Sequence, residues 1–180
     1  MIDSVEIYRQ ADRMVEKHGT RNPETIAKEL GIMIIESDDF TDLLGMYTVR
    51  WHHRIMLLNR MMEYYLRLMV IGHELGHDAR HRQLAMAEGM KEFTLFNTKD
   101  KTEYEANAFA AHLLLENDAV YELAREGFTT SQIASKLNTH PDLLLIKVQE
   151  MNRLGYDFKL PVEPDSCFFK KIRCDNNETQ

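Results

Sequence analysis

Two histidines and a glutamate stand together in the segment His73-Glu74-Leu75-Gly76-His77, and their types and spacing suit metal-assisted hydrolysis. Side chains four residues apart share one face of a helix, so His73 and His77 can each give a nitrogen to one Zn²⁺, at about 2.1 Å. Glu74 can then lean over the open side of the ion, where a carboxylate can take a proton from water and return it to a leaving amine. This HExxH arrangement is typical of zinc peptidases, so we expect Zn²⁺ as cofactor, with His73 and His77 as ligands and Glu74 as catalytic residue.

The residues before the motif indicate the elements that must position it. Met62, Leu66, Met69 and Val70 lead into His73 and His77 at helical spacing, which predicts a motif helix that is buried on that side. Short runs rich in β-branched and aliphatic residues predict strands at 32–35, 44–49 and 55–58, and the last two runs could form a hairpin. An edge strand of this sheet could pair with an extended peptide and hold its scissile carbonyl at the metal. Alternatively, the sheet could merely cover the motif helix, and the sequence leaves both interpretations open.

A third zinc ligand is needed, and a second helix that begins near Thr102 offers two candidates, Glu103 and Glu105. Positions two apart on a helix differ by about 200°, so the two carboxylates cannot face the same ion. Glu103 shares a face with Asn107, which could hydrogen-bond a ligand histidine from outside the metal shell. Thr102 and Glu105 have the spacing of a capping box, which would give Glu105 an ordinary role at the helix start. We therefore expect Glu103 as the third ligand and Asn107 as its supporting neighbour.

The other histidines near the motif are poorer metal ligands. His52 and His53 are adjacent, so in a strand they point to opposite faces, and we interpret them as turn or surface residues. His81 lies four residues after His77, but each step of four drifts by about 40° around a helix. Three such side chains cannot converge well on one ion, and the position six residues after His77 is Gln83. We therefore expect His81 either beside a ligand or facing solvent.

The overall pattern predicts an α+β fold: a mostly helical, zincin-like domain with a small sheet that contains an antiparallel pair, and a helical C-terminal region. We expect three parts: 1–126 as the metallopeptidase domain, 127–160 as a helical region packed on it, and 161–180 as a partly disordered tail. The stretch from Arg82 to Lys101 is interpreted as a connection over the site, in which certain apolar side chains could form a lid or simply pack. Those side chains are Phe93, Leu95 and Phe96. Helices are also expected at 3–18, 23–30, 118–126, 131–137 and for about 14 residues from Pro141.

Composition excludes several classes of protein. The 180 residues include 44% hydrophobic ones, which is typical of a globular chain, and the formal net charge is −7. An acidic balance argues against general nucleic-acid binding, and no apolar run is long enough to span a membrane. The N-terminus lacks the pattern of a secretory signal, and the two cysteines, Cys167 and Cys174, both lie near the C-terminus. A cytoplasmic protein with no direct nucleic-acid or membrane partner is the simplest expectation.

The chain resembles the ImmA/IrrE family of HExxH metallopeptidases from about residue 5 to 125. The resemblance rests on three segments: Leu58-Asn59 before the motif helix, His73 to His77, and Glu103-Tyr104-Glu105-Ala106-Asn107-Ala108-Phe109-Ala110-Ala111-His112-Leu113-Leu114. In the family the first glutamate of the last segment is a metal ligand, which corresponds to Glu103 here. The family often ends this segment with Leu-Met-Pro, whereas this chain continues with Leu115-Glu116-Asn117, which bears on the substrate cleft rather than on the metal.

The resemblance implies a zinc endopeptidase whose protein substrate is a helix-turn-helix transcriptional repressor of a mobile element or stress regulon. The alternative is a non-catalytic regulator that binds and antagonises the repressor and keeps the zinc fold as a scaffold. Glu74 favours the enzyme, because a binding module has no need for a carboxylate over the open side of a metal. A third interpretation, a transcription factor that uses the C-terminal helices, is disfavoured by the acidic charge.

Overall fold

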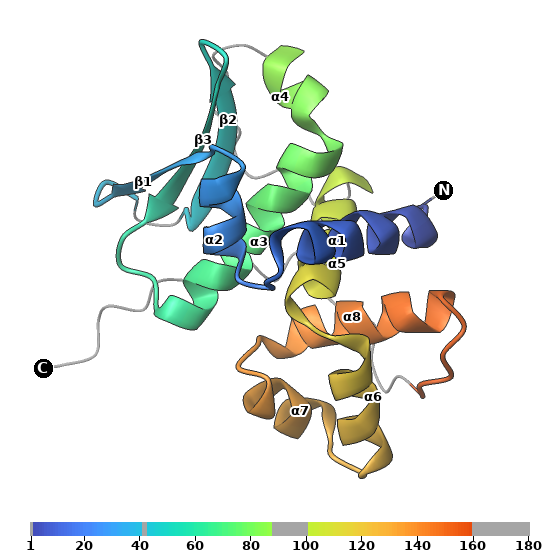
Figure 1. Ribbon diagram of the computed structural model, residues 1–180. Coiled ribbons are helices and arrows are strands. Elements are labelled where there is room, and N and C mark those ends of the chain that lie inside the picture. The colour runs from blue at the N-terminus through green and yellow to red at the C-terminus, as the bar shows by residue number, and fades with distance from the viewer. Residues whose placement is uncertain (1, 41–42, 88–100, 160–180) are drawn as a thin grey trace, which may run out of the picture.

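The computed structural model describes residues 2–40, 43–87 and 101–159, and it has the predicted α+β fold. A small sheet lies on one side of a set of helices, and the last three described helices gather at the opposite end (Figure 1). The described elements are, in chain order, α1 (Ser4–His18), α2 (Pro23–Glu29), β1 (Met33–Ser37), β2 (Gly45–Arg50), β3 (His53–Asn59), α3 (Tyr64–Arg80), α4 (Arg82–Ala87), α5 (Lys101–Leu114), α6 (Asn117–Arg125), α7 (Thr130–Lys136) and α8 (Pro141–Arg153).

The three strands form a mixed sheet in the order β1-β3-β2. β2 and β3 make the predicted hairpin, and Arg50 pairs with His53 across a two-residue turn. Both turn residues, Trp51 and His52, have positive φ, which is the requirement of a type I′ hairpin turn. His52 and His53 are exposed, so their interpretation as turn or surface residues is confirmed.

One face of the hairpin packs on α3. The cross-strand partners Tyr47 and Met56 share this face with the pair Gly45 and Leu58, and the side chains of Tyr47, Met56 and Leu58 are buried. Gly45 is required here, because a Cβ at this position would lie 2.5 Å from Cγ1 of Val70 on α3. The missing side chain lets β2 approach the helix that carries the metal motif.

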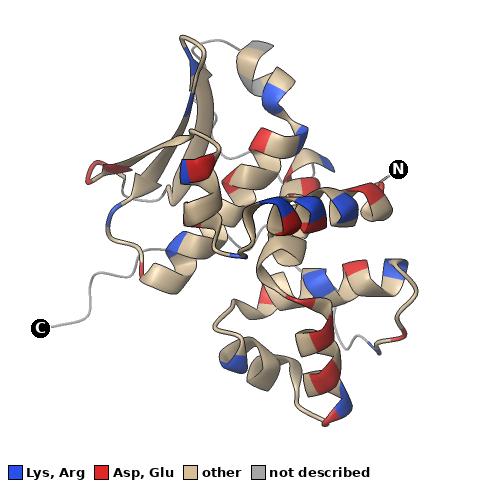
Figure 2. Cartoon of the chain, viewed as in Figure 1, with Lys and Arg blue, Asp and Glu red and all other residues tan. Residues whose placement is uncertain are grey.

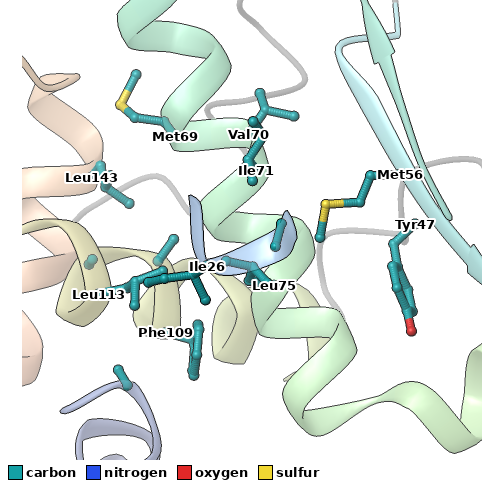
Figure 3. Close-up of a cluster of buried hydrophobic side chains, with 14 of the residues drawn as sticks. Ile26, Tyr47, Met56, Met69, Val70, Ile71, Leu75, Phe109, Leu113 and Leu143 are labelled. Carbon is teal, nitrogen blue, oxygen red and sulfur yellow. The ribbon is translucent and has the colours of Figure 1, made fainter. Parts of the chain in front are cut away.

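The main core fills the space between α3, α5, α2 and the sheet (Figure 3). α3 contributes Ile71 and Leu75, and α5 contributes Phe109 and Leu113, all with no exposed surface. α3 and α5 cross through small residues, since Gly72 lies against Ala110 and Gly76 lies against Ala106. This close crossing brings the motif helix and the second predicted helix together.

The two N-terminal helices follow their local signals. Asn22 caps α2 through hydrogen bonds from the backbone of Glu24 and Thr25, and Pro23 occupies the first helical position. Gly19 ends α1 in the left-handed conformation, with a φ of 63°. Local sequence therefore explains the boundaries of both helices.

The last three described helices enclose a second apolar cluster, which includes Val120 of α6 and also Leu115, just before that helix. Helix starts differ slightly from expectation: α6 begins at Asn117, and Thr129 caps α7 in a capping box with Gln132, one residue earlier than expected. The division of the chain at residue 126 remains a prediction.

The connection between Arg82 and Lys101 was expected without regular structure, but Arg82–Ala87 forms a short helix, α4. This helix lies beside β2, so the local chain has a packing partner that the sequence pattern did not reveal. Phe93, Leu95 and Phe96, which could form a lid or simply pack, lie outside the described residues, as do the expected tail at 161–180 and both cysteines.

Candidate metal centre

Three buried donor groups meet where α3 crosses α5. The Nε2 atoms of His73 and His77 lie 3.0 Å apart, and the Glu103 carboxylate lies 3.5 Å from the former and 3.3 Å from the latter. All three ligating atoms fall within 4.8 Å of one another. Ligands held tetrahedrally at about 2.1 Å from an ion lie about 3.4 Å apart, so these side chains fit a single small cation. Two imidazoles and one carboxylate are a donor set that suits Zn²⁺ and leaves one position open.

Burial keeps the two histidines in the form that binds metals. Burial lowers the pKa of His73 to about 4, although the nearby Glu103 carboxylate opposes the shift. Burial and the charge of His81 lower the pKa of His77 to about 3. Both imidazoles are therefore neutral near pH 7, with a lone pair available for a cation.

Asn107 contacts the first histidine, as its position on α5 suggested. Its Oδ1 lies 2.8 Å from Nδ1 of His73, and the side chain is buried. An amide oxygen can only accept, so Nδ1 of His73 must carry the proton and Nε2 is left to face Glu103. Asn107 thus selects the tautomer that directs the free nitrogen toward the cluster.

Glu105 does not form the expected capping box. Thr102 lies inside the described helix α5 (Lys101–Leu114), so it cannot serve as the N-cap. The Glu105 carboxylate is instead buried against α3, where Arg80 donates two hydrogen bonds to Oε2 at 3.0 and 2.8 Å. Burial alone would raise the pKa of Glu105, but the hydrogen bonds and charge of Arg80 outweigh it and lower the pKa.

His81 ends α3 beside the cluster and does not face solvent. Its Nδ1 lies 3.1 Å from Nδ1 of His77, and its Nε2 lies 3.3 Å from the Glu105 carboxylate. His81 thus touches the second histidine on the side that points away from Glu103.

Glu74, on α3, is buried against the start of β2. It is only 3% exposed, and it accepts a hydrogen bond from the backbone of Tyr47. Burial and the neighbouring Glu103 charge raise its pKa to about 8. A divalent cation held by the adjacent side chains would favour the ionised carboxylate.

Asp78, directly after the second histidine, fixes α3 to the hairpin. The Tyr47 hydroxyl donates to Asp78 at 2.5 Å, and the guanidinium groups of Arg54 and Arg82 also bind this carboxylate. Burial and the bond to Asp78 raise the pKa of Tyr47 well above its usual range. Sequence reasoning missed this clamp, because Tyr47 and Arg54 are 31 and 24 residues from Asp78 and no local pattern joins them to it.

A second clamp at the end of β3 was also missed. The Asn59 amide donates to the backbone carbonyls of Phe40 and Leu43, and Asn59 Oδ1 accepts from the backbone of Met61. The side chain thereby ties the segment before β2 to the segment that leads into α3. The pair Leu58-Asn59 in the sequence was the available signal.

Basic and acidic positions are interleaved along the described helices, most clearly on α1 (Figure 2). This distribution is not the one-sided basic face of a nucleic-acid-binding protein. Within the ranges that the structure covers, no helix combines the length and the apolar character needed to cross a bilayer.

The peptidase family M78, described as the IrrE N-terminal-like domain, matches residues 25–148, a range that includes His73, Glu74, His77 and Glu103. The chain is 34% identical over 128 residues to Uncharacterized immunity region protein 2 of Bacillus phage phi105. The matched segment covers 71% of this chain and 80% of that protein. It is 28% identical over 144 residues to Metallopeptidase ImmA of Bacillus subtilis strain 168, with 73% of this chain and 78% of that protein covered.

Proposed function

The chain belongs to the ImmA/IrrE family of metallopeptidases, and from this membership we propose that it is a zinc-dependent endopeptidase that cleaves a helix-turn-helix repressor. One observation carries the proposal. The donor atoms of His73, His77 and Glu103 lie within 4.8 Å of one another in a buried site, and the Glu74 carboxylate lies beside them. Three protein ligands with an adjacent carboxylate are the requirement of a hydrolytic rather than a purely structural zinc site.

We assign each residue a role in the proposed reaction. His73, His77 and Glu103 would hold the zinc ion, which when bound would polarise the scissile carbonyl and acidify the attacking water. Glu74 would take the proton from that water and pass it to the nitrogen of the departing amine. Asn107 would keep His73 in the tautomer that presents Nε2 to the ion.

The position of β2 supports an extended peptide as substrate. β2 is an edge strand of the described sheet, and its start lies against Glu74, since a Cβ on Gly45 would be 3.4 Å from Oε1 of that residue. A peptide that added to this edge would run past the metal ligands with its carbonyls held by backbone hydrogen bonds. This arrangement suits an endopeptidase, which must bind chain on both sides of the cleaved bond.

A repressor as substrate is the finer part of the proposal. It rests on family membership, and the name of the phage relative, an immunity region protein, is in keeping with it. The test is to mix the purified zinc-bound protein with the helix-turn-helix repressor encoded beside it and to follow the products by mass spectrometry. We expect two new fragments from one cut, and no fragments after zinc is removed by a chelator and washed away. An intact repressor in both samples would contradict this choice of substrate.

A further inference from the structure

The second histidine of the motif has a supporting contact of its own. Nε2 of His77 faces Glu103, whereas Nδ1 lies 3.1 Å from Nδ1 of His81 on the opposite side of the ring. Two imidazole nitrogens can form a hydrogen bond only if one of them carries a proton and the other does not. If Nε2 of His77 gives its lone pair to a metal, the proton of the neutral ring must be on Nδ1. His77 is therefore the donor and His81 is the acceptor.

This assignment determines the state of His81 as well. With Nδ1 accepting, the proton of a neutral His81 is on Nε2, which lies 3.3 Å from the Glu105 carboxylate. The ionised Glu105 carboxylate can accept a hydrogen bond from this N–H. Two hydrogen bonds from Arg80 hold the carboxylate in place, and Arg80 also donates to Gln10 on α1 at 2.8 Å. The nitrogen of Lys101 also lies 3.3 Å from this carboxylate.

We propose that His81 and Glu105 are positioning residues for His77, joined to it in a hydrogen-bonded relay that runs from His77 to His81 to Glu105. This inference rests on the proposed metal site. The relay orients the ring of His77, fixes its tautomer, and makes it a stronger electron donor by ending in a carboxylate. His81 is not a further ligand, because its two nitrogens face Nδ1 of His77 and the Glu105 carboxylate rather than the three proposed metal-binding atoms.

The two metal-binding histidines would then be supported unequally. His73 is held by one neutral amide, Asn107, which is buried with it. His77 is held by a chain of two groups that ends in the anionic Glu105 carboxylate of α5. This carboxylate binds Arg80 of α3, and Arg80 also donates to Gln10 of α1. The relay therefore couples the geometry of one ligand to the packing of three helices.

Zinc affinity measured by competition with a chromophoric chelator, and the visible spectrum of the Co²⁺-substituted protein, test the relay without any assay of proteolysis. In His81→Leu the acceptor for His77 is lost at similar side-chain volume, so we expect zinc binding about 10–100-fold weaker and a shifted Co²⁺ spectrum. In His81→Asn the amide oxygen can take the position of Nδ1 and accept the hydrogen bond from His77. Zinc affinity should therefore be closer to that of the unmodified protein than in His81→Leu. His112→Leu is the matched control, since it removes a different buried histidine, on α5, that does not touch the cluster, and it should leave zinc affinity unchanged.

Glu105→Gln tests the far end of the relay, and it carries the test if His81→Leu does not fold. The loss of charge should weaken zinc binding by less than His81→Leu, and the double variant should be no worse than His81→Leu alone. The relay is overturned if His81→Leu binds zinc as tightly as the unmodified protein, or if His81→Leu and His81→Asn weaken zinc binding equally. It is also overturned if the losses of zinc affinity in His81→Leu and Glu105→Gln simply add in the double variant. If the unmodified protein binds no zinc, the proposed metal site itself is refuted. The experiment therefore distinguishes a failure of the relay from a failure of the metal site.

Discussion

Gly76 on α3 lies so close to Ala106 on α5 that a Cβ at Gly76 would be 2.8 Å from the Ala106 Cα and 2.9 Å from its carbonyl oxygen. Both atoms belong to the backbone, so they cannot rotate away as the end of a side chain can. Gly76 is next to His77, and Ala106 is one helical turn beyond Glu103. The spacing of the two helices that carry the proposed ligands is therefore set by the absence of one methyl group.

We predict that Gly76→Ala forces α3 and α5 apart, lowers the free energy of unfolding by about 1–3 kcal/mol, and weakens zinc binding. Thermal unfolding and a zinc titration on the same samples measure both effects. Gly72→Ala is the matched control on the same helix, because its Cβ would meet only side chains, at 3.2 Å for Leu114 Cδ1, and Leu114 can shift. Equal effects of the two substitutions would show that the backbone contact does not set the site.

Metal stoichiometry tests the ligand set. We expect about one Zn²⁺ per chain by elemental analysis, and loss of that zinc in His77→Ala and in Glu103→Ala, because each removes one of the three proposed protein ligands. His53→Ala is the control, since this histidine is exposed on β3 and should leave the zinc content unchanged. Full zinc content in His77→Ala would place the metal elsewhere.

The site and fold were predictable from sequence where short-range spacing decides the structure. His73 and His77 are one helical turn apart, and the Asn22-Pro23 start of α2 is equally local, so both patterns could be read directly. The pairing of Glu103 with the motif helix could be expected because a metal needs a third ligand and because the family resemblance places one at this position.

Contacts between distant segments could not be predicted in this way. Asp78 bonds to Tyr47 across 31 residues, and the type of neither residue indicates the other. The capping-box prediction for Glu105 was wrong for the same reason, since Thr102 lies inside α5 and Arg80, 25 residues from Glu105, supplies a charged partner. Local spacing permitted the box, and tertiary packing replaced it.

Glu74→Gln separates the enzyme from a non-catalytic regulator. Glutamine has nearly the same shape but cannot accept a proton, so zinc should be retained while proteolysis falls at least about a hundredfold. Zinc content and the rate of repressor cleavage, each compared with the unmodified protein, are the measurements. Undiminished cleavage would exclude Glu74 as the base, and full release of repression by an uncleaving variant would favour the regulator that only binds.

A buried lysine lies far from the metal cluster, at the junction of α5 and α8. Lys147 has no exposed surface, and its Nζ lies 3.1 Å from Nδ1 of His112. Burial and the charge of Arg21 lower the pKa of Lys147 to about 7, although Asp12, Glu150 and Glu116 oppose the shift. Burial and the charge of Lys147 itself lower the pKa of His112 to about 2, so this histidine is a neutral acceptor at neutral pH.

The lowered lysine pKa predicts the pH dependence of stability. Between pH 7 and the ordinary value of 10.5, the unfolded chain binds a proton at Lys147 that the folded chain does not, so the contribution of this group to the free energy of unfolding rises with pH. Below pH 7 both states are protonated, and the full cost of burying the charge remains. Lys147→Met keeps the packing but removes the charge, so this variant should be more stable than the unmodified protein at pH 6, and its advantage should shrink as the pH rises toward 10.

Urea unfolding of the two metal-free proteins at several pH values measures this difference, and the other titrating groups largely cancel because both proteins contain them. Lys17→Met, at an exposed lysine of α1, is the control and should show little change in its effect across the same range. If the unmodified protein is instead the more stable one at pH 6, the Glu150 carboxylate must favour the charged ammonium by more than burial disfavours it. In that case Lys147 would be a stabilising ion-pair partner of Glu150 within α8 rather than a buried cost.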